Sequence, residues 1–261
     1  MASDYAARKA YFDSLMTLFG RKPVEEALTD PDVEPVCLHL AESNRPSAQI
    51  ERLIEAASAR GADIRYHSRE ALSRISKNRK QDQGVAVDVR APAWQRLDDL
   101  VDGEPVTSGL IAVDGITNPQ NLGMIIRAVG ASPRGGLILA RHGNAPIDGL
   151  VIKASAGTLF RTPVYRCDRL PEALDSLKSI GYRICGLDAN ATQALADLEP
   201  GPHVLVFGNE TTGLSDEVRD RCDDLISLPM ARGIESLNVA VAAGIVAFAP
   251  VFRRRGDAAP R

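Results

Sequence analysis

The chain contains 261 residues, of which 44% are hydrophobic and 25% are charged, a composition typical of a globular protein. This length is sufficient for two domains of ordinary size. Only 5% of the residues are aromatic and the formal net charge is -3, so the chain is not expected to bind single-stranded nucleic acid mainly by stacking bases on aromatic rings.

Metal, disulfide and membrane classes are also disfavoured. The widely spaced cysteines form no C-x-x-C pair, so we expect neither a zinc site nor a disulfide framework, and no metal is assigned. The N terminus lacks a secretory signal, and the most apolar stretch, Val239 to Phe252, is too short to span a bilayer. These features predict a cytoplasmic protein without a membrane segment. The four cysteines are Cys37, Cys167, Cys185 and Cys222.

Residues 1–90 predict a small α/β domain in which helices and strands alternate. Within it, residues 1–18 are expected to form an amphipathic extension that docks onto this domain or onto a partner. The expected elements are a helix near Val24 to Leu28, a strand Pro35 to Leu40, a helix Ala48 to Ala59, a strand Asp63 to Tyr66, a helix Arg69 to Ile75 and a strand Val85 to Val89.

A basic run lies near the end of this segment. Between Arg65 and Lys80 the chain has six Arg and Lys residues and a single acid, Glu70. Such a run is equally compatible with a solvated face and with a surface that contacts phosphates. The six basic residues are Arg65, Arg69, Arg74, Lys77, Arg79 and Lys80.

Residues 91–106 are rich in Pro, Gly and Asp and are expected to form a linker. Residues 107–261 then alternate strands and helices, which predicts a mostly parallel sheet covered by helices on both faces. The glycines at 130, 135 and 136 lack the G-x-G-x-x-G spacing and no P-loop is present, so a dinucleotide or nucleoside triphosphate site is disfavoured.

Within this second segment, strands are expected at Leu110 to Val113, Leu137 to Leu139, Pro163 to Tyr165, Tyr182 to Leu187, His203 to Phe207 and Leu225 to Leu228. Helices are expected at Leu122 to Val129, Gly149 to Ser155, Pro171 to Ile180, Asp216 to Cys222 and Leu237 to Phe248.

Three polar loops in this segment each follow a short apolar strand. They read TNPQNLGMIIR (Thr117 to Arg127), FGNETTGLSDEV (Phe207 to Val218) and LPMARGIESLNVAVAAG (Leu228 to Gly244). Because open α/β sheets bind ligands at the carboxyl ends of their strands, these loops are expected to come together in one candidate active site.

Some polar residues of these loops have a simpler explanation as helix caps. Asn118, Asn121, Ser215 and Ser236 each stand near an expected helix start, where a side-chain oxygen accepts an unpaired backbone N–H. Glu210 lies outside that explanation.

Arg127 lies within an apolar helix and would need an anionic partner if it were buried, either an RNA phosphate or a structural carboxylate.

The three loops resemble, in order, the three motifs of the SpoU/TrmH class of SPOUT RNA ribose 2′-O-methyltransferases. NPQNLGMIIR matches motif 1, GNETTGL motif 2 and PMARGIESLNVAVAAGI motif 3, with KASAGTLFRTPV between motifs 1 and 2 in its usual place. GRKPVEEAL (Gly20 to Leu28) and DQGVAV (Asp82 to Val87) resemble the edges of the family's L30e-like substrate-binding domain, so the resemblance covers nearly the whole chain.

The resemblance implies transfer of a methyl group from S-adenosylmethionine to a ribose 2′-hydroxyl, with residues 107–261 as a methyltransferase domain that ends in a trefoil knot and residues 1–90 as an RNA-binding domain. It implies a homodimer formed through the catalytic domain. Asn121, Arg127, Glu210, Ser236 and Asn238 occupy the family's catalytic and substrate positions. The backbone around Gly208, Leu228 and Leu237, with Met230, would hold the cofactor.

The general base stays open between two residues. Family proposals give Arg127 a part in activating the hydroxyl, but a guanidinium stays protonated and suits a phosphate clamp better. Glu210 is the easier proton acceptor, although it is also placed to orient Arg127 or the loops. The resemblance assigns the basic run to RNA contacts.

The target RNA is open as well. Ribosomal RNA is favoured over transfer RNA because of the amino-terminal module. The alternatives are a tRNA methyltransferase, a non-catalytic RNA-binding SPOUT protein, and an enzyme acting on a small nucleotide. Asp82 stands where the family often has His, and Ala240 where it often has Ser.

Overall fold

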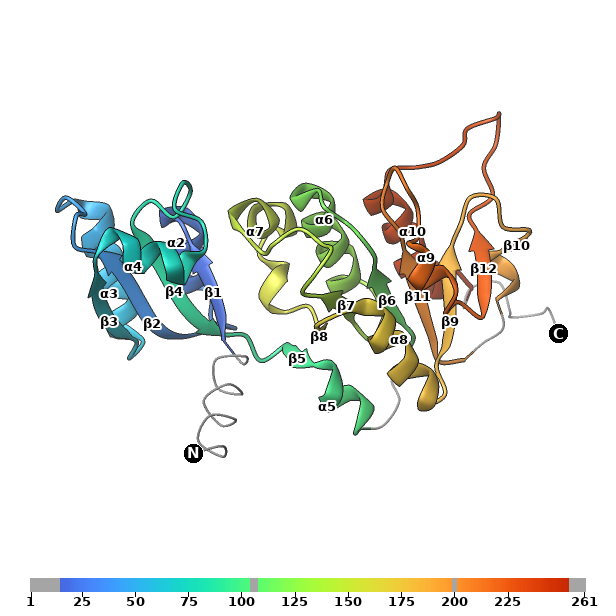
Figure 1. Ribbon diagram of the computed structural model, residues 1–261, viewed down its shortest axis with the longest axis horizontal. Helices are drawn as coiled ribbons and strands as arrows, with labels where there is room; N and C mark the ends of the chain where they lie inside the picture. Colours follow the sequence, from blue (N-terminus) through green and yellow to red (C-terminus); the bar gives the residue numbers. More distant parts are fainter. Residues whose placement is uncertain (1–14, 104–107, 199–200, 254–261) are drawn as a thin grey trace. The chain divides into compact units, whose positions relative to one another are not determined.

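The structure is a computed structural model that describes residues 15–103, 108–198 and 201–253 (Figure 1). These residues divide into two compact units. One contains the described residues up to Ala93 together with Ile147–Lys153, and the other contains those of Trp94–Pro146 and Ala154–Arg261.

The first unit is built on a four-stranded sheet with the order β1-β4-β2-β3. β4 runs antiparallel to both of its neighbours, whereas β2 and β3 are parallel. The strands are β1 (Met16–Phe19), β2 (Glu34–Ala41), β3 (Asp63–His67) and β4 (Val85–Arg90). The helices are α2 (Arg21–Thr29), α3 (Ala48–Ala59) and α4 (Arg69–Ser76).

Ser residues start two of these helices. The hydroxyl of Ser47 accepts the N–H of Ile50 ahead of α3, and that of Ser68 accepts the N–H of Ala71 ahead of α4. Leu72 of α4 packs on the small residues Ala41 and Ala86, so α4 covers one end of one sheet face.

β1 corrects the expectation for the amino terminus. Residues 16–18 of the expected amphipathic extension belong to a strand, in which Met16 and Leu18 are buried and alternate with half-buried neighbours. Pairing of β1 with β4 attaches these residues to this domain, one of the two expected alternatives, but four residues are too few to reveal the strand period in the sequence. Residues 1–14 of that extension lie outside the described part of the chain.

The second unit is built on an eight-stranded sheet with the order β10-β12-β9-β11-β6-β7-β8-β5. Every pair in it is parallel, as the sequence predicts for most of the sheet. The strands are β5 (Trp94–Arg96), β6 (Leu110–Val113), β7 (Leu137–Ala140), β8 (Val164–Cys167), β9 (Arg183–Leu187), β10 (Gln193–Ala194), β11 (His203–Phe207) and β12 (Asp224–Ser227).

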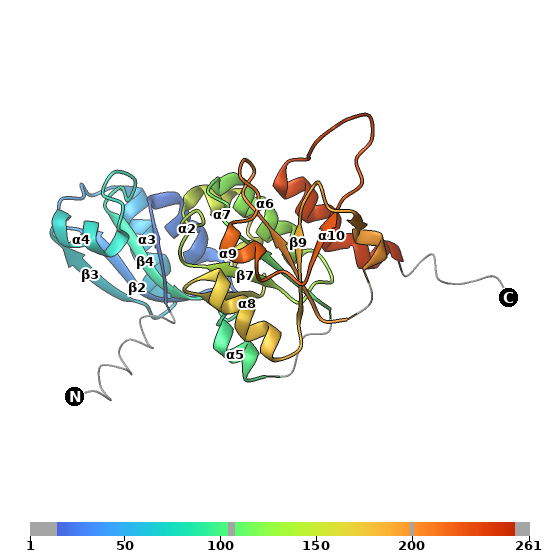
Figure 2. The ribbon, with the colours of Figure 1, turned by 45° about the vertical axis from the view of Figure 1, so that its right-hand side comes forward.

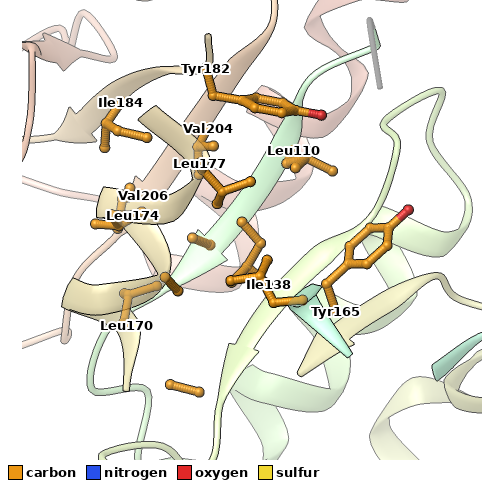
Figure 3. Packing of buried hydrophobic residues seen from close by; sticks show 14 of the residues in the cluster. Leu110, Ile138, Tyr165, Leu170, Leu174, Leu177, Tyr182, Ile184, Val204 and Val206 are labelled. Atoms are coloured by element: carbon orange, nitrogen blue, oxygen red, sulfur yellow. The ribbon is translucent and has the colours of Figure 1, made fainter. Parts of the chain in front are cut away.

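Helices cover both faces of this sheet. One face carries the apolar core in Figure 3, where Leu174 and Leu177 of α8 pack on Val204 of β11 and Ile184 of β9. On the other face α6 and α10 pack together. The helices of this unit are α5 (Leu97–Val101), α6 (Pro119–Gly130), η1 (Thr158–Phe160), α8 (Leu170–Ser179), η2 (Leu195–Asp197), α9 (Asp216–Arg219) and α10 (Val239–Arg253). Most of α7 (Gly149–Ser155) belongs to the first unit.

The expected linker contains two regular elements. β5 pairs with β8 at the edge of the sheet, and Leu97 and Leu100 of α5 are buried in the core. Trp94 is buried and donates its indole N–H to the carbonyl of Leu159 at 2.8 Å. The segment between Pro92 and Gly103 therefore contains a short strand and a short helix and is not a continuous linker.

α10 continues through Pro250 and thus beyond Phe248, the expected end of this helix. A proline inside a helix has no N–H for the carbonyl four residues earlier, which here belongs to Val246. Arg134 donates to that carbonyl at 2.8 Å. A side chain from the loop after α6 thus supplies the hydrogen bond that the proline removes.

Candidate active site at the carboxyl ends of parallel strands

The three polar loops follow β6, β11 and β12, which run parallel in one sheet, so all three leave the sheet at the same edge. The loop after β12 is the longest, and Figure 2 shows it extending away from the sheet before α10 begins. The loops thus gather where the sequence predicts.

Asn121 is the buried centre of the site. Asn118 is the N-cap of α6, and its side chain accepts the N–H of Gln120, so Asn121 is not needed as a cap. Asn121 is 6% exposed and its amide donates to Oε1 of Glu210 at 2.5 Å. The two residues are 89 positions apart in the sequence.

Asn238 joins the third loop to this pair. Its side-chain oxygen accepts the N–H of Ala240 at 2.9 Å and that of Val241 at 3.3 Å at the start of α10. Its amide nitrogen donates to the side-chain oxygen of Asn121 at 3.1 Å. The cap of α10 is therefore Asn238, whereas the sequence also allowed Ser236.

These contacts fix the direction of every hydrogen bond in the group, which we call the amide chain (Glu210, Asn121 and Asn238). Backbone N–H groups can only donate, so the Asn238 atom facing α10 is its oxygen. Its nitrogen must then face Asn121, whose own nitrogen must face Glu210. Oε1 of Glu210 is consequently an acceptor, and the chain orients the carboxylate from the start of α10.

The loop that holds Glu210 folds back on itself. The side chain of Asn209 accepts the N–H groups of Thr211 and Thr212 and donates to the carbonyl of Gly115 at 2.7 Å, which ties the loop after β11 to the loop after β6. Oδ2 of Asp114 accepts the N–H of Ser215 at 2.7 Å.

Gly208 allows the loop after β11 to fold back on itself. A Cβ at Gly208 would lie 2.2 Å from the carbonyl carbon of Gly213, so the close approach that the glycine permits is to the chain's own backbone. Ser215 occupies the N-cap of α9 without a side-chain capping bond, unlike the cap expected from the sequence.

Arg127 and Ser236 lie outside the amide chain. Arg127 is exposed on α6, so its apolar neighbours do not bury it, and its side chain needs no structural carboxylate. Ser236 is exposed in the loop before α10. Within the described residues, no hydrogen bond joins either side chain to the amide chain.

The expected cofactor residues lie in the same loop region. Leu228 and Met230 are half-buried just beyond β12, and Leu237 is 39% exposed immediately before Asn238. Leu237 is next in sequence to Asn238 of the amide chain, and Leu228 and Met230 lie in the same loop after β12. The combination suits a ligand with both an apolar and a hydrogen-bonding part.

Cysteine and metal chemistry are not indicated here. Burial is the main cause that raises the pKa of Cys167 and of Cys185 to about 12 each, so neither is a thiolate nucleophile near neutral pH. Among the described residues, no group of three or more His, Cys, Asp or Glu is arranged to hold a metal ion. No helix in this part of the chain is long and apolar enough to cross a membrane.

The basic run in the first unit divides into structural and exposed residues. Arg69 pairs with Asp82 at 2.5 Å and donates to the carbonyl of Arg79 at 2.8 Å. Asp82 is fully buried and also accepts from Ser76 and from the N–H of Gly84, each at 2.9 Å. This network holds the loop between α4 and β4, and the Asp that departs from the family pattern is its centre.

The other members of the run differ in position. Arg65 lies on β3 and pairs with Asp63 at 3.1 Å, and Arg74 is exposed on α4. Lys77, Arg79 and Lys80 are exposed in the loop that Asp82 holds, which we call the basic loop.

Three further basic residues reach the same end of the sheet: Arg21, Lys22 and Arg45. The N–H of Arg21 donates to Gln83 at 3.0 Å, and Asn44, next to Arg45, donates to the carbonyl of Gly84 at 2.7 Å. No local excess of positive charge marks these residues in the sequence, because two glutamates, Glu25 and Glu26, follow Arg21 and Lys22, and Arg45 has no basic neighbour.

Comparison with known proteins gives two family matches. The profile of the SpoU rRNA Methylase family matches residues 109–248, and the profile described as RNA 2′-O ribose methyltransferase substrate binding matches residues 17–95. A Mycolicibacterium smegmatis protein described as an uncharacterized tRNA/rRNA methyltransferase is 36% identical over 256 residues, which cover 96% of this chain and 79% of the relative.

Solved structures agree with these matches. The SpoU methyltransferase AviRb from Streptomyces viridochromogenes, in complex with its cofactor AdoMet, is 25% identical and superposes with a TM-score of 0.64 over 95% of this chain and 94% of its own. An rRNA methyltransferase from Sinorhizobium meliloti, 24% identical, shares the fold with a TM-score of 0.62 over 96% of this chain and 91% of its own.

Proposed function

Because the chain belongs to the SpoU rRNA methylase family of RNA methyltransferases, we propose that it transfers a methyl group from S-adenosylmethionine to a ribose 2′-hydroxyl of RNA. The amide chain is the observation that supports this proposal most strongly, because it unites one residue from each motif loop in a single group. S-Adenosylmethionine supplies a methyl group that is already activated on a sulfonium.

The loop residues fit this cofactor in chemical type. Leu228, Met230 and Leu237 offer apolar surface for the adenine ring and the methylene groups of the methionine part, and backbone groups of the same loop offer hydrogen bonds. AviRb, which has the same fold, was solved with AdoMet bound. These residues are proposed to hold the cofactor beside the amide chain.

Little covalent help is required from the protein, because the reaction needs an oriented hydroxyl, a proton acceptor and exclusion of water. Glu210 accepts from Asn121 through Oε1, which leaves Oε2 to accept the proton of the ribose hydroxyl. The exposed guanidinium of Arg127 is proposed to hold the adjacent phosphate, because it stays protonated and donates in a fixed fork. Ser236 is proposed to hold the substrate.

RNA contacts are proposed for the first unit as well. The basic loop, Arg21, Lys22 and Arg45 place exposed or half-buried positive charge at one end of the four-stranded sheet, within the residues that match the substrate-binding profile. Arg65 and Arg74 contribute charge farther along β3 and α4, and Arg69 positions the basic loop.

The protein is further proposed to act in the cytoplasm as a homodimer, with ribosomal RNA favoured over transfer RNA. Apolar side chains exposed on two packed helices support self-association, namely Met124 of α6 and Val241 and Ile245 of α10. Val241→Asp should convert the dimer to a monomer in light scattering. An unchanged mass would place the dimer contact elsewhere.

Calorimetry with S-adenosylmethionine and a methyl-transfer assay on total RNA test the proposal together. We expect cofactor binding and labelled RNA. Binding without labelling would identify a non-catalytic RNA-binding protein. Transfer to a small nucleotide in the absence of RNA would identify the third alternative.

A further inference from the structure

Polar side chains form a row across one face of the four-stranded sheet. Its members lie within the strands except for His67, which is the last residue of β3. Paired residues of neighbouring strands share a face, and the pairing places Thr17 opposite Asp88, and Ala41, two residues beyond His39, opposite His67. We call Thr17, Asp88, His39 and His67 the histidine row.

Hydrogen bonds join the row from end to end. Thr17 donates to Oδ1 of Asp88 at 2.6 Å, and Oδ2 of Asp88 lies 3.0 Å from Nε2 of His39. Nδ1 of His39 lies 2.9 Å from Nε2 of His67. His39 is 5% exposed, whereas His67 is half-buried at the end of β3.

The geometry determines what the outer nitrogen of His67 does. With a proton on both nitrogens, His39 donates to Asp88 and to His67, so Nε2 of His67 is an acceptor and its remaining proton is on Nδ1. With one proton fewer, His39 accepts from Nε2 of His67, and Nδ1 of His67 becomes an acceptor. In the first state the positive charge is on buried His39, and in the second state both rings are neutral. The outer nitrogen therefore changes from donor to acceptor although His67 itself is neutral in both states.

Charges around the row favour the state with the extra proton. Burial alone would lower the pKa of His39, but the hydrogen bonds with Asp88 and Cys37 and the charges of these two groups raise it to about 9. Burial, the charge of His39 and the charge of Arg65 lower the pKa of His67, against an opposing effect of Glu42. Although burial would raise the pKa of Asp88, the hydrogen bonds from His39 and Thr17 lower it.

His67 also adjoins the proposed RNA surface. Its carbonyl accepts the N–H of Glu42, in the loop that leads to Arg45. Ser68 follows as the N-cap of α4, and Arg69 anchors the basic loop. A hydrogen-bond donor at this position continues the positive surface onto the sheet face. An anionic acceptor is the ligand that such a donor suits.

We propose that Nδ1 of His67 donates a hydrogen bond to a phosphate oxygen of the bound RNA, and that Asp88 and His39 position it as a donor. This inference rests on the proposed function, because it takes RNA as the substrate of the first unit. His67 is a binding residue, and His39 and Asp88 are positioning residues.

Two amide substitutions of the full-length protein separate the inner and outer contacts of His67. His67→Asn places an amide N–H near the position of Nδ1, and His67→Gln places one near Nε2. The KM for total RNA from cells that lack the protein should stay near the wild-type value in His67→Asn and rise about tenfold in His67→Gln and His67→Ala, the loss expected for one hydrogen bond to a charged group.

The pH dependence of KM gives a second readout. The wild-type KM should rise between pH 7.5 and 9.5, where His39 loses its proton, and the KM of His67→Asn should stay flat, since an amide does not titrate. Asp88→Asn removes the carboxylate that favours charged His39, so the rise should begin at lower pH.

Three outcomes would overturn the inference: the same KM in all variants, a KM in His67→Gln equal to that of the wild type while His67→Asn fails, or pH profiles that Asp88→Asn does not move. A wild-type protein that methylates no RNA would instead overturn the proposed function. A variant that unfolds is recognised by its melting temperature, and the Asp88→Asn profile then decides.

Discussion

In the eight-stranded parallel sheet the polar side chains of the candidate site lie beyond the strand ends, whereas in the four-stranded sheet a polar row crosses one face of the strands. Parallel strands with helices on both faces have no open face, so only their ends are available for polar groups. In the four-stranded sheet, α4 packs on Ala41 and Ala86 at one end of a face, and Asp88, His39 and His67 lie on the same face.

The difference predicts two kinds of mutational effect. Changes at the strand ends should reduce turnover with little effect on RNA affinity. Changes in the four-stranded sheet and its loops should alter RNA affinity or stability and leave the chemistry intact.

Arg127→Ala should give the largest effect. Loss of its proposed phosphate contact should lower kcat by about 100-fold or more, the cost typical of removing one positioned donor. Because Arg127 is exposed, the melting temperature and the affinity for S-adenosylmethionine should stay unchanged in calorimetry. An equal loss of cofactor binding would contradict its role, and Arg127→Lys serves as the charge-preserving control.

Asn238→Asp tests the amide chain separately from helix capping. Aspartate still caps α10 but presents an acceptor to the oxygen of Asn121, so the chain to Glu210 is broken. We expect kcat to fall about tenfold, in line with the loss of one hydrogen bond, with a small change in melting temperature. Wild-type kcat in this variant would show that the direction of the amide chain does not matter.

The triple variant Lys77→Ala, Arg79→Ala and Lys80→Ala tests the basic loop. Removing three phosphate contacts should reduce the slope of log affinity against log salt by about two to three. The matched control is Arg52→Ala, Arg90→Ala and Arg96→Ala, which removes the same charge from residues paired with acids and outside the proposed RNA contacts. Equal changes of this slope in the two variants would mean that the basic loop acts only through the overall charge of the protein and makes no specific phosphate contacts.

The smallest effect concerns stability against pH. The pKa of His39 is raised to about 9 from an ordinary value of 6.5, so the folded state binds the proton more tightly than the unfolded state. This stabilisation is fully present below pH 6.5 and is lost as the pH rises to about 9. Urea unfolding of the wild type should show this decline.

The control for that prediction is Asp88→Asn, which should flatten the decline between pH 6.5 and 9. The lowered pKa of Asp88 acts in the opposite direction, because its stabilisation is present above 3.8 and is lost as the pH falls below that value. A decline of equal steepness in Asp88→Asn would mean that another group causes it.

The parallel sheet and its site were largely predictable from the sequence. Apolar strands such as Leu110–Val113 and His203–Phe207 occur with the predicted bounds, and polar residues that follow parallel strands must meet at one edge. The individual hydrogen bonds of Asn121 to Glu210 and Asn238 were not predictable, since these two residues come from loops far along the chain. The trefoil knot implied by the resemblance stays a prediction. Periodicity could not have revealed it, because the threading of a chain leaves no periodic pattern in the sequence.

The histidine row and the edge elements were not predictable. His39 lies in a strand of which most residues are buried, and nothing local distinguishes it from a core residue. β1, β5 and β10 are too short to show a period, so only their pairing partners define them. Arg69 and Asp82 looked like surface charge because their ion pair spans 13 residues.

Alkaline hydrolysis of RNA labelled by the protein with methyl-labelled S-adenosylmethionine tests the central claim most directly. A 2′-O-methyl group removes the nucleophile for strand cleavage, so the account predicts label in alkali-resistant dinucleotides, and far less of it with the Asn238→Asp variant. Label in mononucleotides would mean that a base is methylated and would contradict the assignment of the ribose hydroxyl as the acceptor.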